Sequence, residues 1–201
     1  MPDLLPIRRA LFSVSDKTGL VSLASALHQR GATLTASGGT AEALREASLP
    51  TEEVADITGF PEMMNGRLKT LHPRIHGGLL ADRSDPAHLA AMETHAIPPI
   101  DLLAVNLYPF AETLAQTSDA AALIEKIDIG GPAMLRAAAK NHAHVCVLSD
   151  PSDYAPFLES LREHNGATPF ALRRELAAAA FRRTAAYDTA IANWLAHYAR
   201  P

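Results

Sequence analysis

The order of apolar runs and helical periods in the first sixty residues is the feature that most constrains the fold. Residues 10–14 form a short apolar run, residues 20–31 carry apolar side chains at helical spacing up to a glycine, and residues 32–36 form a second run. A helix from about residue 41 to 46 and a third short strand at 54–57 are expected next. Strand, helix, strand and helix in this order predict a parallel sheet with right-handed crossover helices.

The rest of the chain continues the alternation. Two more strands are expected, at 100–105 and 144–148, and helices are expected at about 85–95, 120–127, 131–140 and 154–163. Thr168-Pro169 is typical of a helix start, with a capping hydroxyl and proline at the first helical position. The helix that follows carries an apolar and aromatic stripe, expected to face the core or a second copy in a homodimer. Its members are Leu172, Leu176, Ala180, Tyr187, Ile191, Trp194 and Tyr198.

No repeat or linker divides the chain. One α/β domain over residues 1–201 is therefore expected, with a core of about 8–150 and a helical C-terminal part of about 151–201.

Composition excludes several classes of protein. A net charge of −4 and 5% aromatic residues give no basic surface for nucleic acid. No apolar run approaches the roughly 20 residues that span a bilayer, and the start lacks the pattern of a secretion signal. Cys146 is the single cysteine, so an internal disulfide and a thiolate metal cluster are excluded, and its apolar neighbours predict a buried strand residue. A cytoplasmic protein without nucleic-acid or membrane partners is expected.

Polar loops follow several of the expected strands. Gly38-Gly39 between a strand and a helix lets backbone amides approach an anion at a helix N-terminus. A second loop, residues 65–73, gathers two cations, a hydroxyl and an imidazole between turn-forming residues. These loops predict a composite site for a phosphate monoester, although a simple tight turn capped by Thr40 is the alternative for the first. The donors nearest the first loop are Ser13, Ser15, Lys17, Ser37 and Thr40.

Asp128 and Lys140 allow a structural and a functional interpretation. An aspartate before Gly130-Gly131 suits an N-cap, and a lysine at a helix end suits the helix dipole. Both residues also suit acid–base chemistry, and the residues alone leave the choice open.

Metal and acyl-enzyme chemistry are not supported. His72 and His76 have a spacing that suits zinc only on a continuous helix, and Pro73 and Gly77-Gly78 argue against that continuity. No Ser-His-Asp order and no Gly-x-Ser-x-Gly pattern occurs.

Taken together, eight blocks resemble the IMP cyclohydrolase domain of the bifunctional purine biosynthesis protein, in order, from about Arg9 to about Tyr198. The blocks are SVSDKTG at 13–19, ASGGT at 36–40, TGFPEM at 58–63, GRLKTLHP at 66–73, NLYPF at 106–110, IDIGGP at 127–132, RAAAKNH at 136–142 and AFRRTAAYD at 180–188. Each block alone is moderately specific, and the full set is very specific.

The resemblance implies a methylglyoxal synthase-like three-layer fold, with a parallel central sheet flanked by helices. It also implies closure of 5-formamidoimidazole-4-carboxamide ribotide (FAICAR) to IMP with release of water, without metal or organic cofactor. Lys140 matches the family's acid/base lysine. The substrate-binding residues implied by the matching blocks are Ser13, Ser15, Asp16, Lys17, Ser37, Gly38, Gly39, Thr40, Arg67, Leu68, Lys69, Thr70, Asn106, Leu107, Asp128, Ile129, Gly130 and Gly131.

Ring closure suits these groups. The carboxamide nitrogen and the formyl carbon belong to one molecule, so the enzyme needs only to hold a near-attack rotamer. We expect Lys69 and Tyr108 to stabilise charge on the formyl oxygen. Asp128 and Lys140 are expected to form a coupled pair that relays protons, and which of them is the base stays open.

Two departures from the family pattern stand out. Asn65 and Met64 occupy positions where an acidic residue and leucine are usual. The large formyl-transferring domain that family members usually carry does not follow, so no transformylase activity is expected of this chain. A stand-alone enzyme and an excised domain are equally compatible with the sequence.

Two rival functions share the expected fold. Methylglyoxal synthase is disfavoured by the long helical back half and by the Lys69 and Lys140 blocks. A non-catalytic nucleotide-sensing domain, as in carbamoyl phosphate synthetases, explains the Gly38-Gly39 turn but gives Tyr108, Asp128 and Lys140 no purpose.

Overall fold

A five-stranded parallel sheet lies at the centre of the computed structural model, which describes residues 3–64 and 66–198. The strand order is β4-β3-β2-β5-β6, and each neighbouring pair is parallel, as the alternation of elements predicts. The strands are β2 (Arg9–Val14), β3 (Thr33–Ala36), β4 (Thr51–Glu53), β5 (Leu102–Asn106) and β6 (Cys146–Leu148).

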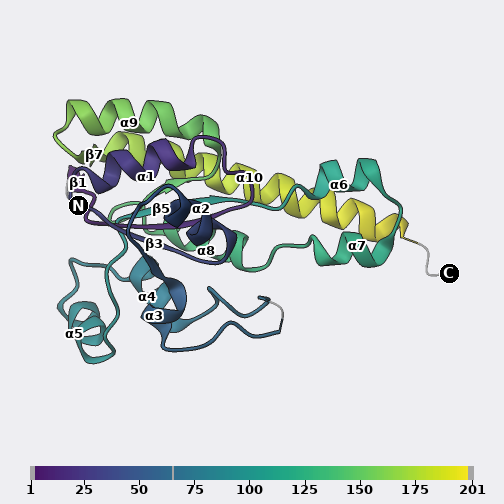
Figure 1. The fold of residues 1–201 in the computed structure, drawn as a ribbon, viewed down its shortest axis with the longest axis horizontal. Helices are drawn as coiled ribbons and strands as arrows, with labels where there is room; N and C mark the ends of the chain where they lie inside the picture. Colours follow the sequence, from purple (N-terminus) through teal and green to yellow (C-terminus); the bar gives the residue numbers. More distant parts are fainter. Residues whose placement is uncertain (1–2, 65, 199–201) are drawn as a thin grey trace.

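Helices cover both faces of this sheet (Figure 1). Helix α1 packs with α2 and α9 on one face, and α8 packs with α4 and α10 on the other. The helices are α1 (Leu20–His28), α2 (Gly39–Glu46), α3 (Val54–Thr58), α4 (Pro73–Leu80), α5 (Pro86–Thr94), α6 (Phe110–Gln116), α7 (Ala120–Glu125), α8 (Gly130–Lys140), α9 (Tyr154–Glu163), preceded by the 3-10 turn η1 (Pro151–Asp153), and α10 (Phe170–His197).

Strand β5, next to the central strand β2, is buried in the core. Its residues Leu102, Leu103, Ala104 and Val105 are at most 1% exposed, because helices close both faces of the sheet. Fully burying each leucine or valine contributes roughly 1.5–3 kcal/mol. Cys146 of β6 is also fully buried, and burial raises the pKa of its thiol to about 12, so it is a core residue as the sequence predicts.

The C-terminal segment returns to the start of the chain. Strand β7 (Ala167–Pro169) pairs antiparallel with β1 (Leu4–Pro6), and α10 then runs along α8 and β6. Near its far end, Tyr187 and Trp194 meet the ring of Phe110 edge-on, with centroids 6.3 and 5.7 Å away. This part of the predicted stripe therefore packs against α6 of the same chain.

Two sequence predictions about local structure are wrong. Residues 54–57 form helix α3 instead of a strand, because Glu53 and Asp56 make a reciprocal capping box, and the third strand is β4 just before it. The final helix begins at Phe170 instead of Pro169. Thr168 belongs to β7, where its hydroxyl donates to the carbonyl of Leu5.

Helix α4 corrects a third expectation. It is continuous from Pro73, with proline at its first position and His72 as N-cap, despite Gly77 and Gly78. A Cβ on Gly78 would lie 2.5 Å from the carbonyl oxygen of Pro98, so glycine permits close packing of α4 against that backbone. His72 Nδ1 accepts a hydrogen bond from the Arg74 N–H. Among the described residues, no group of three or more potential ligands is placed to hold a metal ion.

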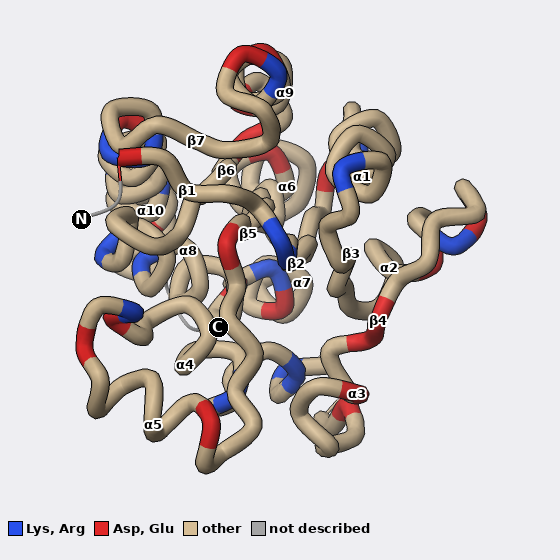
Figure 2. The backbone as a smooth tube through the Cα atoms, turned by 90° about the vertical axis from the view of Figure 1, so that its left-hand side faces the viewer, with Lys and Arg blue, Asp and Glu red and all other residues tan. Residues whose placement is uncertain are grey.

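Residues of both charges are distributed along the backbone, as Figure 2 shows. In the described part of the chain, every helix is too short or too polar to cross a membrane.

Candidate active site

Strand register brings three polar loops to one edge of the sheet. Val14 at the end of β2 lies opposite Asn106 at the end of β5, and Phe12 lies opposite Ala36 at the end of β3. Because parallel strands end at the same edge, the loops after β2, β3 and β5 open there together, which is where ligands of such sheets bind.

A cavity of about 750 Å³ lies at this edge. Fifteen of the predicted site residues line it: Ser13, Ser15, Lys17, Ser37, Gly39, Thr40, Arg67, Lys69, Thr70, Asn106, Tyr108, Asp128, Ile129, Gly130 and Gly131. The separate loops therefore line one cavity.

The Gly38-Gly39 turn is flanked by two ammonium groups. Lys69 Nζ lies 2.5 Å from where a Cβ on Gly38 would stand, and Lys17 Nζ lies 3.8 Å from the corresponding position on Gly39. Gly38 has φ +50° and ψ −136°, a conformation that only glycine adopts readily, and α2 begins at the next residue. Two cations, a helix N-terminus and a side-chain-free turn together suit a phosphate group.

Two acidic residues pair with the cations of the loop at residues 66–70. Lys69 Nζ lies 2.8 Å from Glu62 Oε2, and Arg67 pairs with Glu125 of α7. Both carboxylates line the cavity, and neither was predicted as a site residue. An anionic ligand at the turn must compete with Glu62 for Lys69.

Two of the side chains expected to bind the ligand also support the backbone. The Asn106 amide accepts from the N–H groups of Ser15 and Asp16, at 2.6 and 2.8 Å, and donates to the Asp16 carbonyl. Thr40 Oγ1 accepts from the Val14 N–H and donates to the Val14 carbonyl, at 3.1 and 3.2 Å. These side chains therefore hold the loop after β2 in place.

Asp128 lines the same cavity from the loop just before α8. Its Oδ1 accepts the Gly131 N–H at 2.9 Å, as the N-cap interpretation expects. Burial raises the pKa of this carboxyl, and hydrogen bonds from the N–H groups of Gly131 and Gly130 only partly oppose that rise. A half-buried carboxylate with a raised pKa is suited to accept a proton.

Neighbouring groups complete that side of the cavity. Thr70 Oγ1 lies 2.7 Å from where a Cβ on Gly130 would stand, so the loop before α4 touches the start of α8. The ring of Tyr108 is half exposed, and Lys126 Nζ lies 5.5 Å from its centroid. A cation beside the ring leaves the Tyr108 hydroxyl in a favourable electrostatic setting for hydrogen bonding to an oxygen that gains charge.

Four predicted site residues lie beside the cavity without lining it. Asp16 caps the Thr18 N–H, which lowers the pKa of its carboxyl. Leu68 makes a β-bridge with Met63, and Leu107 packs near Gly131. Gly38 contributes through its turn, as above. Asn65 lies outside the described residues.

Lys140 is in a different place. It ends α8, whereas Asp128 precedes the same helix, and the ends of this 11-residue helix lie about 15 Å apart. Lys140 lines a second cavity formed with α4 and α10. In this structure Asp128 and Lys140 therefore line different cavities. Lys69 lies beside the glycine turn, and its expected contact with the formyl oxygen stays a prediction.

One supporting residue comes from far along the chain. Tyr187 Oη of α10 accepts the Asp128 N–H at 2.8 Å and donates to the Lys126 carbonyl at 2.9 Å. The sequence places Tyr187 only on the apolar stripe, and no local pattern distinguishes its hydroxyl. Tyr187 does not itself line the cavity; the lining residues that were not predicted are Val14, Glu62, Gly66, Ile124, Glu125 and Ile127.

The fold and cavity define a class: a parallel α/β domain with a polar, cation-bearing cavity at the carboxyl ends of its strands. The family model described as MGS-like domain matches residues 19–133, and the chain belongs to that family. The model described as AICARFT/IMPCHase bienzyme matches residues 138–200, so the MGS-like part continues into the C-terminal part of that bienzyme group.

Relatives agree with this assignment. The chain is 60% identical over 195 residues to the bifunctional purine biosynthesis protein PurH of Chelativorans sp. (strain BNC1) and 57% identical to that of Brucella canis. Each match covers 97% of this chain, and the chain spans 36% of the relatives' length. The crystal structure of ForH superposes with a TM-score of 0.84 at 40% identity, covering 94% of this chain and 96% of ForH.

Proposed function

We propose that this chain is an IMP cyclohydrolase, which closes FAICAR to IMP and releases water in purine biosynthesis. The observation that carries the proposal is the single cavity in which two lysines flank the Gly38-Gly39 turn and which Asp128 also lines. Relatives named for bifunctional purine biosynthesis support the same reaction.

The phosphate of the ribotide is assigned to the glycine turn. Lys17 and Lys69 neutralise its charge, Ser37 supplies a hydroxyl, and the N-terminus of α2 supplies backbone N–H groups. Charge-assisted hydrogen bonds contribute roughly 1.5–3 kcal/mol each, so three or four give micromolar binding. Lys69 therefore acts at the phosphate in this proposal.

The imidazole end of the substrate is assigned to the wall formed by Tyr108, Asp128 and Ile129. Asp128 removes a proton from the carboxamide nitrogen, which then attacks the formyl carbon, and the formyl oxygen receives a proton. Loss of that hydroxyl with the formamide N–H proton yields water and the C=N bond of the purine. Tyr108 donates a hydrogen bond to the formyl oxygen as charge develops there.

Lys140 is tested separately, because it stands outside this cavity. If a group transfers a proton in the reaction, the rate changes with pH around the pKa of that group. We expect Lys140→Gln to keep the shape of that profile, whatever its effect on the rate. If the variant lost one limb of the pH–rate profile, Lys140 would be the acid–base group after all.

The direct test is ring closure by the purified chain. Incubation with the formylated ribotide should produce the ultraviolet absorbance of the purine. Asp128→Asn should lower kcat by about a hundredfold, the scale typical of general-base removal. Arg182→Gln, an exposed cation on α10 outside the cavity, is the matched control.

Other outcomes would assign another function. Tight IMP binding without turnover would indicate a nucleotide-sensing domain. Release of methylglyoxal from dihydroxyacetone phosphate would indicate the synthase.

A further inference from the structure

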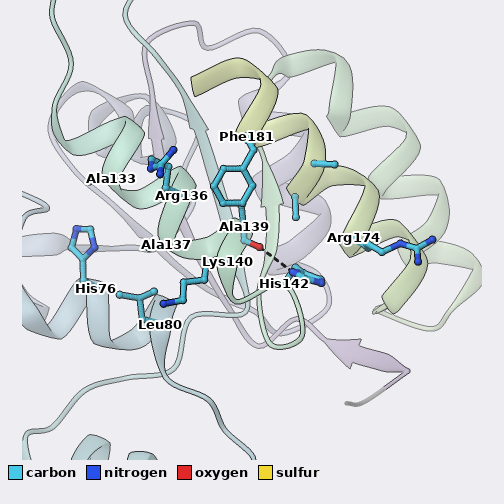
Figure 3. A pocket seen from close by; sticks show the side chains of 12 residues that line it. His76, Leu80, Ala133, Arg136, Ala137, Ala139, Lys140, His142, Arg174 and Phe181 are labelled. Carbon is cyan, nitrogen blue, oxygen red and sulfur yellow. Dashed lines mark hydrogen bonds between the residues drawn. The ribbon is translucent and has the colours of Figure 1, made fainter. Parts of the chain in front are cut away.

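A second cavity of about 770 Å³ lies between α4, α8 and α10, away from the proposed active site. Its floor consists of small apolar residues, Ala133, Ala137, Ala177 and Ala178, with the half-exposed Phe181 ring as a wall. Figure 3 shows Phe181 standing over α8, with Arg136 on one side and Lys140 reaching toward Leu80 of α4.

The charges around this cavity are all of one kind. Arg136, Lys140 and Arg174 line it together with His76 and His142, and no carboxylate does. In the described part of the chain, none of the three cations forms an ion pair. The chain as a whole carries a net charge of −4, so a carboxylate-free cationic cavity departs from its average surface.

Several of these groups are already oriented. The Arg136 guanidinium stacks over Phe181, 5.5 Å from the ring centroid. His142 Nδ1 donates to the Ala139 carbonyl at 3.0 Å, the contact drawn dashed in Figure 3. His76 Nε2 is buried without a hydrogen-bond partner among the described residues. Oriented donors around an apolar floor cost little entropy on ligand binding.

We propose that this second cavity binds an organic anion with a flat apolar body, such as an aromatic carboxylate, sulfonate or phosphate. The alanine floor and Phe181 contact the body, and Arg136, Lys140 and Arg174 neutralise the anionic group. A second copy of the chain is a less suitable occupant. If two copies paired through this face, the three cations of one copy would face the same three cations of the other and repel them.

Two fluorescent probes that share an aromatic body test the role of charge. The anionic probe is 8-anilinonaphthalene-1-sulfonate, and N-phenyl-1-naphthylamine is the neutral counterpart without the sulfonate. The Arg136→Gln/Lys140→Gln double variant should weaken the anionic probe about tenfold, equal to about 1.4 kcal/mol, and the neutral probe less than about twofold. Both residues are exposed, so the fold should persist, which a thermal melt checks. Arg182→Gln, on α10 beside the cavity, controls for lost charge alone.

Three outcomes would overturn the proposal. Equal weakening of both probes would indicate a plain apolar surface. Displacement of the anionic probe by saturating IMP would place it in the first cavity. Concentration-dependent dimerisation that the double variant abolishes, measured by sedimentation, would assign the face to a second copy. None of these measurements requires ring closure. The anion site can therefore fail while the proposed cyclohydrolase function holds, and the reverse.

Discussion

The Tyr187 hydroxyl and the Asp128 backbone N–H form a 2.8 Å hydrogen bond across 59 residues of sequence. The same hydroxyl donates to the Lys126 carbonyl, so it closes the loop that presents Asp128 to the cavity. Burial raises the pKa of Tyr187, which keeps the hydroxyl protonated and able to donate. Helix α10 thus holds the backbone next to the proposed base, Asp128, through the Tyr187 hydroxyl.

Tyr187→Phe removes both hydrogen bonds and keeps the ring that packs on Phe110. We expect kcat for ring closure to fall about tenfold with KM changed less than about twofold, because the base is misplaced while the phosphate site is intact. Tyr198→Phe, which removes a hydroxyl just past the end of α10, is the control. Steady-state kinetics decides, and a rise in KM with unchanged kcat would contradict the positioning role.

Glu62→Gln should tighten IMP binding. Glu62 pairs with Lys69 at 2.8 Å in a partly exposed setting, so the ligand phosphate must displace it. Such a pair contributes about 0.2–1 kcal/mol, which predicts a Kd lowered by about 1.5- to 5-fold. Calorimetric titration measures this, and Glu159→Gln, whose partner Arg162 lies on α9, is the control. Weaker binding would mean that Glu62 contacts the ligand itself.

Gly38→Ala and Gly39→Ala should differ in stability. Gly38 adopts φ +50° and ψ −136°, and a Cβ there would also meet Lys69 Nζ at 2.5 Å. Gly39 is the first residue of α2, and its Cβ would be in ordinary contact with Lys17. Strain of about 1–3 kcal/mol should lower the melting temperature of Gly38→Ala by at least about 2 °C, whereas Gly39→Ala should stay near the wild type. Equal melting temperatures would show that the turn tolerates a side chain.

Asp128→Asn should gain stability while it loses activity. The folded carboxyl has a raised pKa, so its contribution to stability is complete below the unfolded pKa of 3.8 and is lost as pH rises through the folded pKa. At neutral pH the buried charge is therefore a cost that asparagine avoids, while its side-chain oxygen still accepts the Gly131 N–H. We expect the melting temperature to rise by about 2–4 °C at pH 7, corresponding to ~1 kcal/mol, with no gain at pH 3. Melts at both pH values check this, and a lower melting temperature at pH 7 would contradict it.

Much of the fold is predictable because its signals are local. Apolar runs and helical spacing predict β2, α1, β3, β5 and α8 within a few residues of their observed bounds. Strand β4 and helix α3 are misassigned because Val54 and Ile57 resemble a strand, whereas the capping box of Glu53 and Asp56 starts a helix. Helix α4 is missed because Gly78 is used there for close packing against Pro98, a contact between distant segments.

The class of fold and the phosphate-suited turn can be predicted from local sequence, since a glycine pair between an apolar strand and a helix is a property of neighbouring residues. Which side chains share the cavity depends on how distant segments pack. The folded chain gathers Lys17, Lys69 and Asp128 in one cavity and places Lys140 at the other end of α8. It also brings in Glu62 and Tyr187, because strand register and helix packing join segments that no local pattern connects.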